Sequence, residues 1–209
     1  VRSSAASDVY KRQKQRSAMK KVKLHDKEFE LLIDAATIDQ AIAKVANEIN
    51  KDLKDTKPLF LSILNGSFMF TSDLLKQITI PGTEICFMRI ASYEGTSSTG
   101  KIKELIGCNV NLTDRTIVIL EDMIDSGRSM TYLIDYLKGK HPKAIKVATM
   151  FYKPKALTHP VTVDYCALEL ENDFVVGRGL DYDGLGRNYP DLYIFCLLYT
   201  SDAADDLTR

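Results

Sequence analysis

The stretch Ile117–Met130, IVILEDMIDSGRSM, contains a short apolar strand, two adjacent carboxylates and a glycine-containing turn that opens a helix. The β-branched and leucine residues of Thr116–Leu120 are typical of a central, fully buried strand. Glu121 and Asp122 follow at once, and the segment Asp125–Ser129 begins the next helical run. Strands that alternate with helices build a mostly parallel sheet, in which ligands bind at the carboxyl ends of the strands. The stretch therefore predicts an α/β fold with a ligand site at the end of this strand.

The same alternation continues along the chain on both sides of this stretch. We expect helices over Thr37–Leu53, with Thr37 as the cap, Phe68–Gln77 and Ser129–Lys138, and strands over Leu59–Leu64, Glu84–Ile90, Thr116–Leu120, Ala144–Tyr152 and Val161–Leu168. Ala91–Lys103 is rich in Ser, Thr, Gly and Lys and predicts a mobile loop. The segment after Asp173 predicts a small irregular cap over one end of a twisted, mostly parallel sheet flanked by helices.

The turn after the two carboxylates suits a phosphomonoester. Gly127 lets the backbone close around a phosphate, and the following helix offers free N–H groups and a favourable dipole. Ser126 and Ser129 add hydroxyl donors, and Glu121 with Asp122 could bind a sugar diol. An ordinary strand–turn–helix connection with a capping Asp or Ser remains the alternative.

This segment resembles the phosphoribosyl-pyrophosphate motif of type I phosphoribosyltransferases, and it lacks the pattern of a Walker A loop. Further motifs follow the order found in hypoxanthine-guanine phosphoribosyltransferases: Leu64-Asn65-Gly66-Ser67, Ser92-Tyr93, Ser98-Thr99-Gly100, Lys153, Phe174-Val175-Val176-Gly177, Leu180-Asp181-Tyr182 and Arg187. The resemblance covers Met19–Phe195. It implies transfer of the 5-phosphoribosyl group from phosphoribosyl pyrophosphate to N9 of hypoxanthine or guanine, giving IMP or GMP and pyrophosphate.

The resemblance also implies a role for each residue of the quoted stretch. The loop formed by Asp125, Ser126, Gly127, Arg128 and Ser129 would hold the 5′-phosphate. Glu121 and Asp122 would address the ribose hydroxyls, directly or through Mg²⁺. Asp125 would also be the catalytic general base at purine N7, although it could simply order the loop.

Residues outside the stretch would complete the site. Lys153 would donate to the 6-oxo group, Phe174 would stack on the purine, and Val175 would offer backbone groups to the base edge; a solvated lysine and a core phenylalanine are the alternatives. Asp181 would lie near the purine and pyrophosphate as a second metal contact, and Arg187 would clamp pyrophosphate. Leu64, Asn65 and Gly66 would form the pyrophosphate loop with a cis peptide, although many family members have Lys or Arg where this chain has Asn65. Ser92 and Tyr93 would form the base of a flexible lid.

Composition limits the partners of the chain. Among 209 residues, 28 basic and 28 acidic side chains balance, which argues against nucleic acid as a partner. We expect no membrane span. Cys86, Cys108 and Cys166 form no metal-binding pattern, and we interpret them as reduced residues of a cytoplasmic protein. A homodimer or homotetramer is implied by the resemblance alone.

The two ends of the chain match opposite strands of one DNA sequence. The segments Ser3–Gln13, SSAASDVYKRQ, and Cys196–Asp205, CLLYTSDAAD, match translations of the two strands of a sequencing-library transposon adapter. We therefore expect residues 1–18 and 196–209 to be non-native tails around a single domain, 19–195.

Two other functions remain open at this point. A phosphoribosyltransferase for xanthine, adenine or a pyrimidine would keep the phosphate loop and change the base pocket. A ligand-sensing regulator of nucleic acids could keep the fold without the reaction, but it would need a basic face or an added DNA-binding domain.

Overall fold

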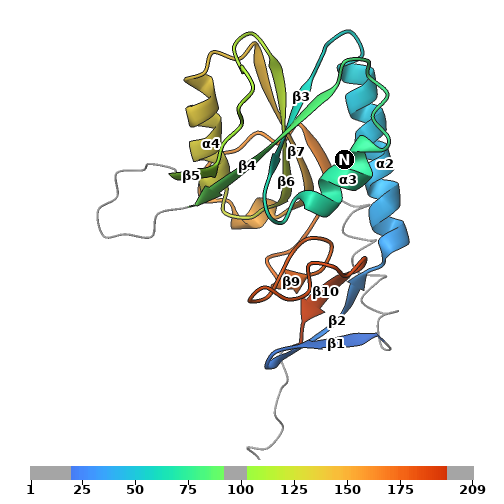
Figure 1. Cartoon of the computed structure of the whole chain (residues 1–209). Helices are drawn as coiled ribbons and strands as arrows, with labels where there is room; N and C mark the ends of the chain where they lie inside the picture. Colours follow the sequence, from blue (N-terminus) through green and yellow to red (C-terminus); the bar gives the residue numbers. More distant parts are fainter. Residues whose placement is uncertain (1–19, 92–102, 197–209) are drawn as a thin grey trace, which may run out of the picture.

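The computed structural model describes residues 20–91 and 103–196, and its main layer is a six-stranded sheet, most of whose strands are labelled in Figure 1. The strands, in the order in which they lie across the sheet, are β5 (Lys103–Ile106), β4 (Glu84–Ala91), β3 (Leu59–Ile63), β6 (Thr116–Ile124), β7 (Ala144–Tyr152) and β8 (Tyr165–Glu169). All neighbouring pairs are parallel except β4 and β5, which are antiparallel. The predicted α/β class is therefore confirmed.

Helices cover both faces of this sheet (Figure 1). Helices α2 (Ala35–Asp52) and α3 (Phe68–Leu75) lie on one face, α4 (Arg128–Lys138) lies on the other, and a 3-10 turn, η1 (Pro154–Ala156), follows β7. The predicted Thr37 cap is wrong, because Asp34 caps α2 by accepting a hydrogen bond from the Thr37 backbone N–H at 2.8 Å. Within the described residues, no helix combines the length and the apolar character that a membrane crossing requires.

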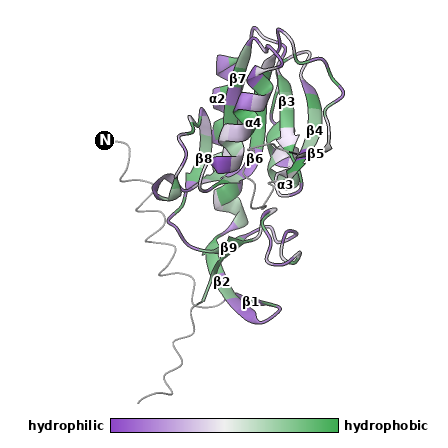
Figure 2. Cartoon of the chain, turned by 90° about the vertical axis from the view of Figure 1, so that its left-hand side faces the viewer, coloured by the Kyte–Doolittle hydropathy of each residue, from purple (hydrophilic) through white to green (hydrophobic). Residues whose placement is uncertain are grey.

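The strands of the main sheet contribute to a core on each face, because successive side chains point to opposite sides. Phe60 and Val118 pack with α2 and α3, whereas Leu61 and Ile119 pack with α4. Accordingly, these strands are coloured mainly as hydrophobic in Figure 2.

A second, smaller sheet meets the carboxyl end of the main sheet. It contains β1 (Lys21–Leu24), β2 (Lys27–Ile33), β10 (Leu192–Phe195) and β9 (Val175–Val176), all antiparallel, in that order. The predicted small cap after Asp173 is confirmed, and residues 177–191 lie in turns, bends and single bridges, although the short strands β9 and β10 join it to this sheet. The cap includes a sheet because β2, from the start of the chain, pairs with β10 from its end.

Two strand boundaries and the state of two cysteines also differ from the predictions. Strand β6 continues to Ile124 and so includes both carboxylates, and β8 begins at Tyr165 rather than Val161. Cys86 and Cys108 form a disulfide, so the expectation that they are reduced is wrong. The return of the chain through β5 brings their Cα atoms to 5.9 Å, a proximity that their sequence spacing did not reveal.

Candidate active site

The predicted phosphate loop lies where β6 passes into α4. Gly127 precedes the first residue of α4 and has a φ of 77°, a left-handed conformation that glycine adopts readily. A Cβ at this position would lie 2.5 Å from the His159 carbonyl oxygen, so only glycine fits. Glu121 and the residues from Met123 to Met130 line a small cavity of about 170 Å³ at this turn. The loop therefore has the tight backbone and the open helix start that a phosphate requires.

The loop is supported from behind by the segment after η1. The backbone N–H groups of Thr158 and His159 donate to the Ser126 carbonyl oxygen at 3.0 and 3.1 Å. The Thr131 hydroxyl donates to the Gly127 carbonyl oxygen at 3.1 Å. These bonds occupy the carbonyl oxygens of Ser126 and Gly127. Thr158, His159 and Thr131 were not recognised from the sequence.

The two adjacent carboxylates of β6 lie in surroundings that disfavour their charge. Burial raises the pKa of Glu121 well above its usual value, and the neighbouring Asp122 charge raises it further. Burial also raises the pKa of Asp122, although a hydrogen bond with Glu121 and the charge of Arg187 act in the opposite direction. A cation or hydroxyl donors from a ligand would stabilise both groups in their charged form.

The predicted pyrophosphate loop contacts both this acidic pair and the cap. The peptide bond between Leu64 and Asn65 is cis, as the resemblance implied. A Cβ on Gly66 would lie only 1.5 Å from the Asp122 Oδ2. A Cβ on Gly179, in the cap, would lie 2.1 Å from the Gly66 carbonyl oxygen. The backbones of the loop and the cap therefore approach each other as closely as glycine allows.

Buried hydroxyl groups fix this loop between β3 and α3. The Ser62 hydroxyl lies 2.8 Å from that of Ser67 and 2.7 Å from that of Thr71. The Ser67 hydroxyl also donates to the Ile63 carbonyl oxygen at 2.5 Å. Sequence reasoning missed this network, although three small hydroxyl residues around a predicted turn were a visible signal.

The predicted base-recognition lysine pairs with the predicted general base. Lys153 Nζ lies 3.2 Å from Asp125 Oδ2, and the Lys153 side chain is only 7% exposed whereas that of Asp125 is 52% exposed. A buried ammonium group needs such a partner. The pair thus places one donor and one acceptor side by side at the edge of the site.

The remaining predicted residues lie in the cap. Arg187 pairs with Asp181 at 2.6 Å and donates to the Gly179 carbonyl oxygen at 2.7 Å. The second oxygen of Asp181 accepts from the Gly184 N–H at 2.7 Å. Phe174 is 46% exposed and packs against Phe29 and Tyr182, with ring centres 6.0 and 5.8 Å apart. Val175 is buried in β9. Ser92 and Tyr93 lie outside the described residues.

The acidic residues fit a magnesium ion only in part. Between residues 20 and 196, leaving out 92–102, no group of three or more Asp, Glu, His or Cys side chains is placed to hold a metal. Both oxygens of Asp181 are already engaged. Glu121 and Asp122 could supply one or two ligands, and magnesium commonly takes the others from water and substrate phosphates.

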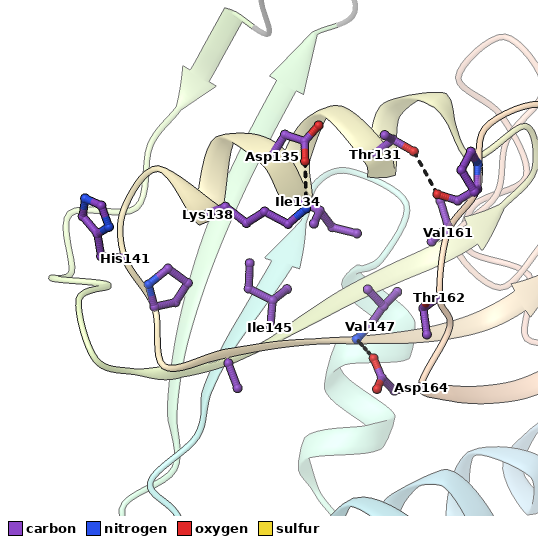
Figure 3. A pocket seen from close by; sticks show the side chains of 13 residues that line it. Thr131, Ile134, Asp135, Lys138, His141, Ile145, Val147, Val161, Thr162 and Asp164 are labelled. Carbon is purple, nitrogen blue, oxygen red and sulfur yellow. Dashed lines mark hydrogen bonds and ion pairs between the residues drawn. The ribbon is translucent and has the colours of Figure 1, made fainter.

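Another hollow, larger than the cavity at the phosphate loop, lies elsewhere in the described residues. It has a volume of about 690 Å³ and lies between α4, the start of β7 and the segment Pro160–Asp164 (Figure 3). Its walls include Ile134, Ile145 and Val161, with Lys138 and His141 at the side. Because it lies away from the acidic pair and from the Lys153–Asp125 pair, we do not assign it to the active site.

Comparison with known proteins identifies the class. A family profile for the phosphoribosyl transferase domain matches residues 32–183. A hypoxanthine-guanine phosphoribosyltransferase of Streptococcus pyogenes serotype M3 is 40% identical over 148 residues, which are 70% of this chain and 82% of that protein. The chain therefore belongs to the phosphoribosyltransferase family.

Solved structures point to the same branch of this family. A hypoxanthine-guanine phosphoribosyltransferase from Bacillus anthracis superposes with a TM-score of 0.74 and 30% identity, covering 79% of this chain and 96% of that one. A hypoxanthine phosphoribosyltransferase from Trypanosoma cruzi, solved as a ternary substrates complex, gives a TM-score of 0.77 and 28% identity, covering 83% and 98%. The chain thus resembles the hypoxanthine-guanine enzymes in both sequence and fold.

Proposed function

We propose that this enzyme acts in purine salvage by transferring the 5-phosphoribosyl group of phosphoribosyl pyrophosphate to N9 of hypoxanthine or guanine. The products are IMP or GMP and pyrophosphate. The observation that carries this proposal is the Lys153–Asp125 pair, whose donor and acceptor are 3.2 Å apart. A 6-oxopurine protonated at N7 presents an acceptor, O6, beside a donor, N7–H, on one edge. Adenine presents an amino group instead of O6 and so would meet the lysine donor to donor.

In this mechanism, the loop from Asp125 to Ser129 binds the 5′-phosphate, and Glu121 and Asp122 hold the ribose hydroxyls. N9 of the base attacks C1′ while the bond from C1′ to pyrophosphate breaks. Asp125 removes the N7 proton as the new bond forms, and its negative charge stabilises positive charge on the sugar. Lys153 holds O6, and Phe174 stacks on the base.

Pyrophosphate is held on the opposite side of the sugar. The backbone of the segment Leu64–Gly66 and the guanidinium of Arg187 are the groups that bind it. Glu121 and Asp122, together with substrate oxygens, would hold Mg²⁺, and the ion would supply positive charge near the pyrophosphate when bound. Asn65 carries no charge, so Arg187 supplies more of the binding than it would beside a basic residue at this position.

The location and assembly of the enzyme belong to the same proposal. Phosphoribosyl pyrophosphate is highly charged and does not cross a bilayer unaided, which places an enzyme that consumes it in the cytoplasm. The Cys86–Cys108 disulfide removes the cysteine argument for that location. We infer a homodimer or homotetramer from the family resemblance alone, and light scattering of the purified protein tests it.

The test is nucleotide formation by the full chain with Mg²⁺, phosphoribosyl pyrophosphate and one base at a time. We expect turnover of hypoxanthine or guanine and none of adenine or uracil; xanthine measures tolerance at position 2 of the purine. Lys153→Met should lower kcat/KM for hypoxanthine by about 100-fold or more, because a buried hydrogen-bond donor is lost. Lys155→Met is the matched control, since Lys155 is exposed and pairs with Glu171.

Other outcomes would change the assignment. Turnover of adenine or uracil would keep the reaction and overturn the base pocket. Tight binding of phosphoribosyl pyrophosphate without turnover of any base would favour the regulator.

A further inference from the structure

Arg178 is a buried arginine in the cap that takes no direct part in the reaction described above. Its side chain is only 6% exposed, and it forms ion pairs with Asp39 of α2 and Asp73 of α3, the latter at 2.8 Å. It also donates to the Pro190 carbonyl oxygen at 3.1 Å. One side chain thus joins the cap to both helices on one face of the main sheet.

The backbone on both sides of Arg178 packs closely against neighbouring segments, as the Arg178 side chain does. Arg178 has a φ of 50° and lies between two glycines. A Cβ on Gly177 would lie 2.1 Å from the Asp191 carbonyl oxygen, and one on Gly179 would lie 2.1 Å from that of Gly66. The segment therefore has little freedom to shift unless its neighbours shift with it.

Both groups that bind pyrophosphate depend on this segment. Gly179 lies against Gly66 of the pyrophosphate loop, and that loop leads directly into α3, which carries Asp73. Arg187 is also attached here, because its side chain donates to the Gly179 carbonyl oxygen at 2.7 Å and its own carbonyl oxygen accepts from the Gly179 N–H at 2.9 Å.

From these contacts we infer that Arg178 is a positioning residue for the pyrophosphate half of the site. Its ion pairs with Asp39 and Asp73 hold Gly179, and through Gly179 they set the separation between the Gly66 loop and Arg187. The inference rests on the proposed function, because it takes pyrophosphate as the group that lies between these two elements. The 5′-phosphate loop and the Lys153–Asp125 pair do not touch Arg178.

The experiment compares ligands that contain pyrophosphate with ligands that do not. For Arg178→Met, we expect KM for phosphoribosyl pyrophosphate, and for pyrophosphate in the reverse reaction, to rise by about tenfold or more, since small displacements of binding groups are costly. The Kd of IMP and the KM of hypoxanthine should change by less than about twofold, because their binding groups are elsewhere. Arg178→Lys should restore only part of the loss, because an ammonium cannot reach both carboxylates and the carbonyl in one fixed geometry.

Two further variants keep the inference falsifiable. Arg115→Met removes an arginine that pairs with Glu84 at 2.9 Å on the main sheet, and it should leave all four constants unchanged. Asp73→Asn retains the shape of α3 and the ion pair between Arg178 and Asp39. It should raise KM for phosphoribosyl pyrophosphate and for pyrophosphate, and it tests the positioning role if Arg178→Met does not fold.

If all four constants rise together in Arg178→Met or Asp73→Asn, the inference is overturned and Arg178 has a structural role only. If none of the constants rises, the inference is overturned as well. If the wild-type protein transfers no phosphoribosyl group, the proposed function fails first. Calorimetric affinities of the same variants for phosphoribosyl pyrophosphate then still test the positioning role separately.

Discussion

Asp125 and Glu121 are carboxylates four residues apart that the fold places in different surroundings. Asp125 is half-exposed and faces Lys153, whereas burial and Asp122 raise the pKa of Glu121. The first surroundings leave Asp125 accessible to a ligand, and the second suit a group that binds a cation. The sequence predicted both residues as part of the site. It could not predict that Asp125 and Lys153 touch, because 27 other residues separate them along the chain.

Asp125→Asn tests the role of the general base. The amide keeps the shape of the side chain and can still accept from Lys153, but it cannot take the N7 proton. We expect kcat to fall by about 10²–10⁴-fold, while KM for phosphoribosyl pyrophosphate changes little. Asp135→Asn, in an exposed ion pair with Lys138, is the control. Equal losses in both constants would leave Asp125 with a structural role only.

Glu121→Gln tests how much the buried acidic pair lowers the stability of the ligand-free protein. A carboxyl whose pKa is raised on folding binds protons more tightly in the folded state, so the wild type gains stability as pH falls from neutral toward the usual value of 4.5. Without ligands at pH 7.5, we expect Glu121→Gln to raise Tm by about 2–4 °C. The gain should shrink toward pH 4.5, and affinity for magnesium with phosphoribosyl pyrophosphate should fall.

Thermal scans across this pH range, with Glu48→Gln as an exposed control, measure the effect. A lower Tm for Glu121→Gln at pH 7.5 would contradict the desolvation argument.

At the scale of elements, five strands of the main sheet, β3, β4, β6, β7 and β8, were predictable because they are apolar runs bounded by turns or helices, whereas the four-residue β5 was not predicted. The hairpin β1–β2 was missed: its apolar residues alternate with Lys and Glu over a few positions, and its main partner, β10, lies at the other end of the chain. Strand β9 has two residues, too few for any periodicity. Contacts between loops, such as that between Gly66 and Gly179, depend on the packing of whole elements and leave no local pattern.

Gly66→Ala should displace the pyrophosphate loop from its position beside Asp122. The added methyl group would overlap the Asp122 carboxylate, so either the carboxylate or the loop must move. We expect kcat/KM for phosphoribosyl pyrophosphate to fall by about 100-fold. Gly139→Ala, where the nearest atom to a new Cβ is 3.3 Å away, should have little effect on the same steady-state measurement. A fully active Gly66→Ala enzyme would mean that the loop is not positioned by this contact.

At the scale of the whole molecule, the two sheets contribute different groups to the proposed site. The main sheet holds the phosphate loop, the acidic pair and the Lys153–Asp125 pair, and the cap contributes Arg187 and the aromatic face of Phe174. Phe174 is supported by Phe29, a fully buried residue of the N-terminal hairpin. The proposed purine side of the site therefore depends on residues from both ends of the domain.

Phe29→Ala tests this dependence. We expect a loss of about 3–5 kcal/mol in the free energy of unfolding, because a large buried side chain is removed. KM for hypoxanthine should also rise several-fold, as Phe174 loses its support, while KM for phosphoribosyl pyrophosphate stays close to that of the wild type. Leu59→Ala, at the far end of β3, should lower stability without changing KM for the base. Denaturant unfolding and steady-state kinetics on both variants separate these effects.

The pairing of β2 with β10 also has a consequence for synthesis of the protein. Strand β2 emerges from the ribosome early, but its neighbour in the cap is almost the last part of the domain to be made. At ordinary translation rates, β2 waits on the order of ten seconds with an open edge. During that time the main sheet can already assemble, but the cap sheet next to the proposed purine site is still incomplete. A message cut short before β10 would therefore yield a polypeptide whose cap lacks the strand that pairs with both β2 and β9.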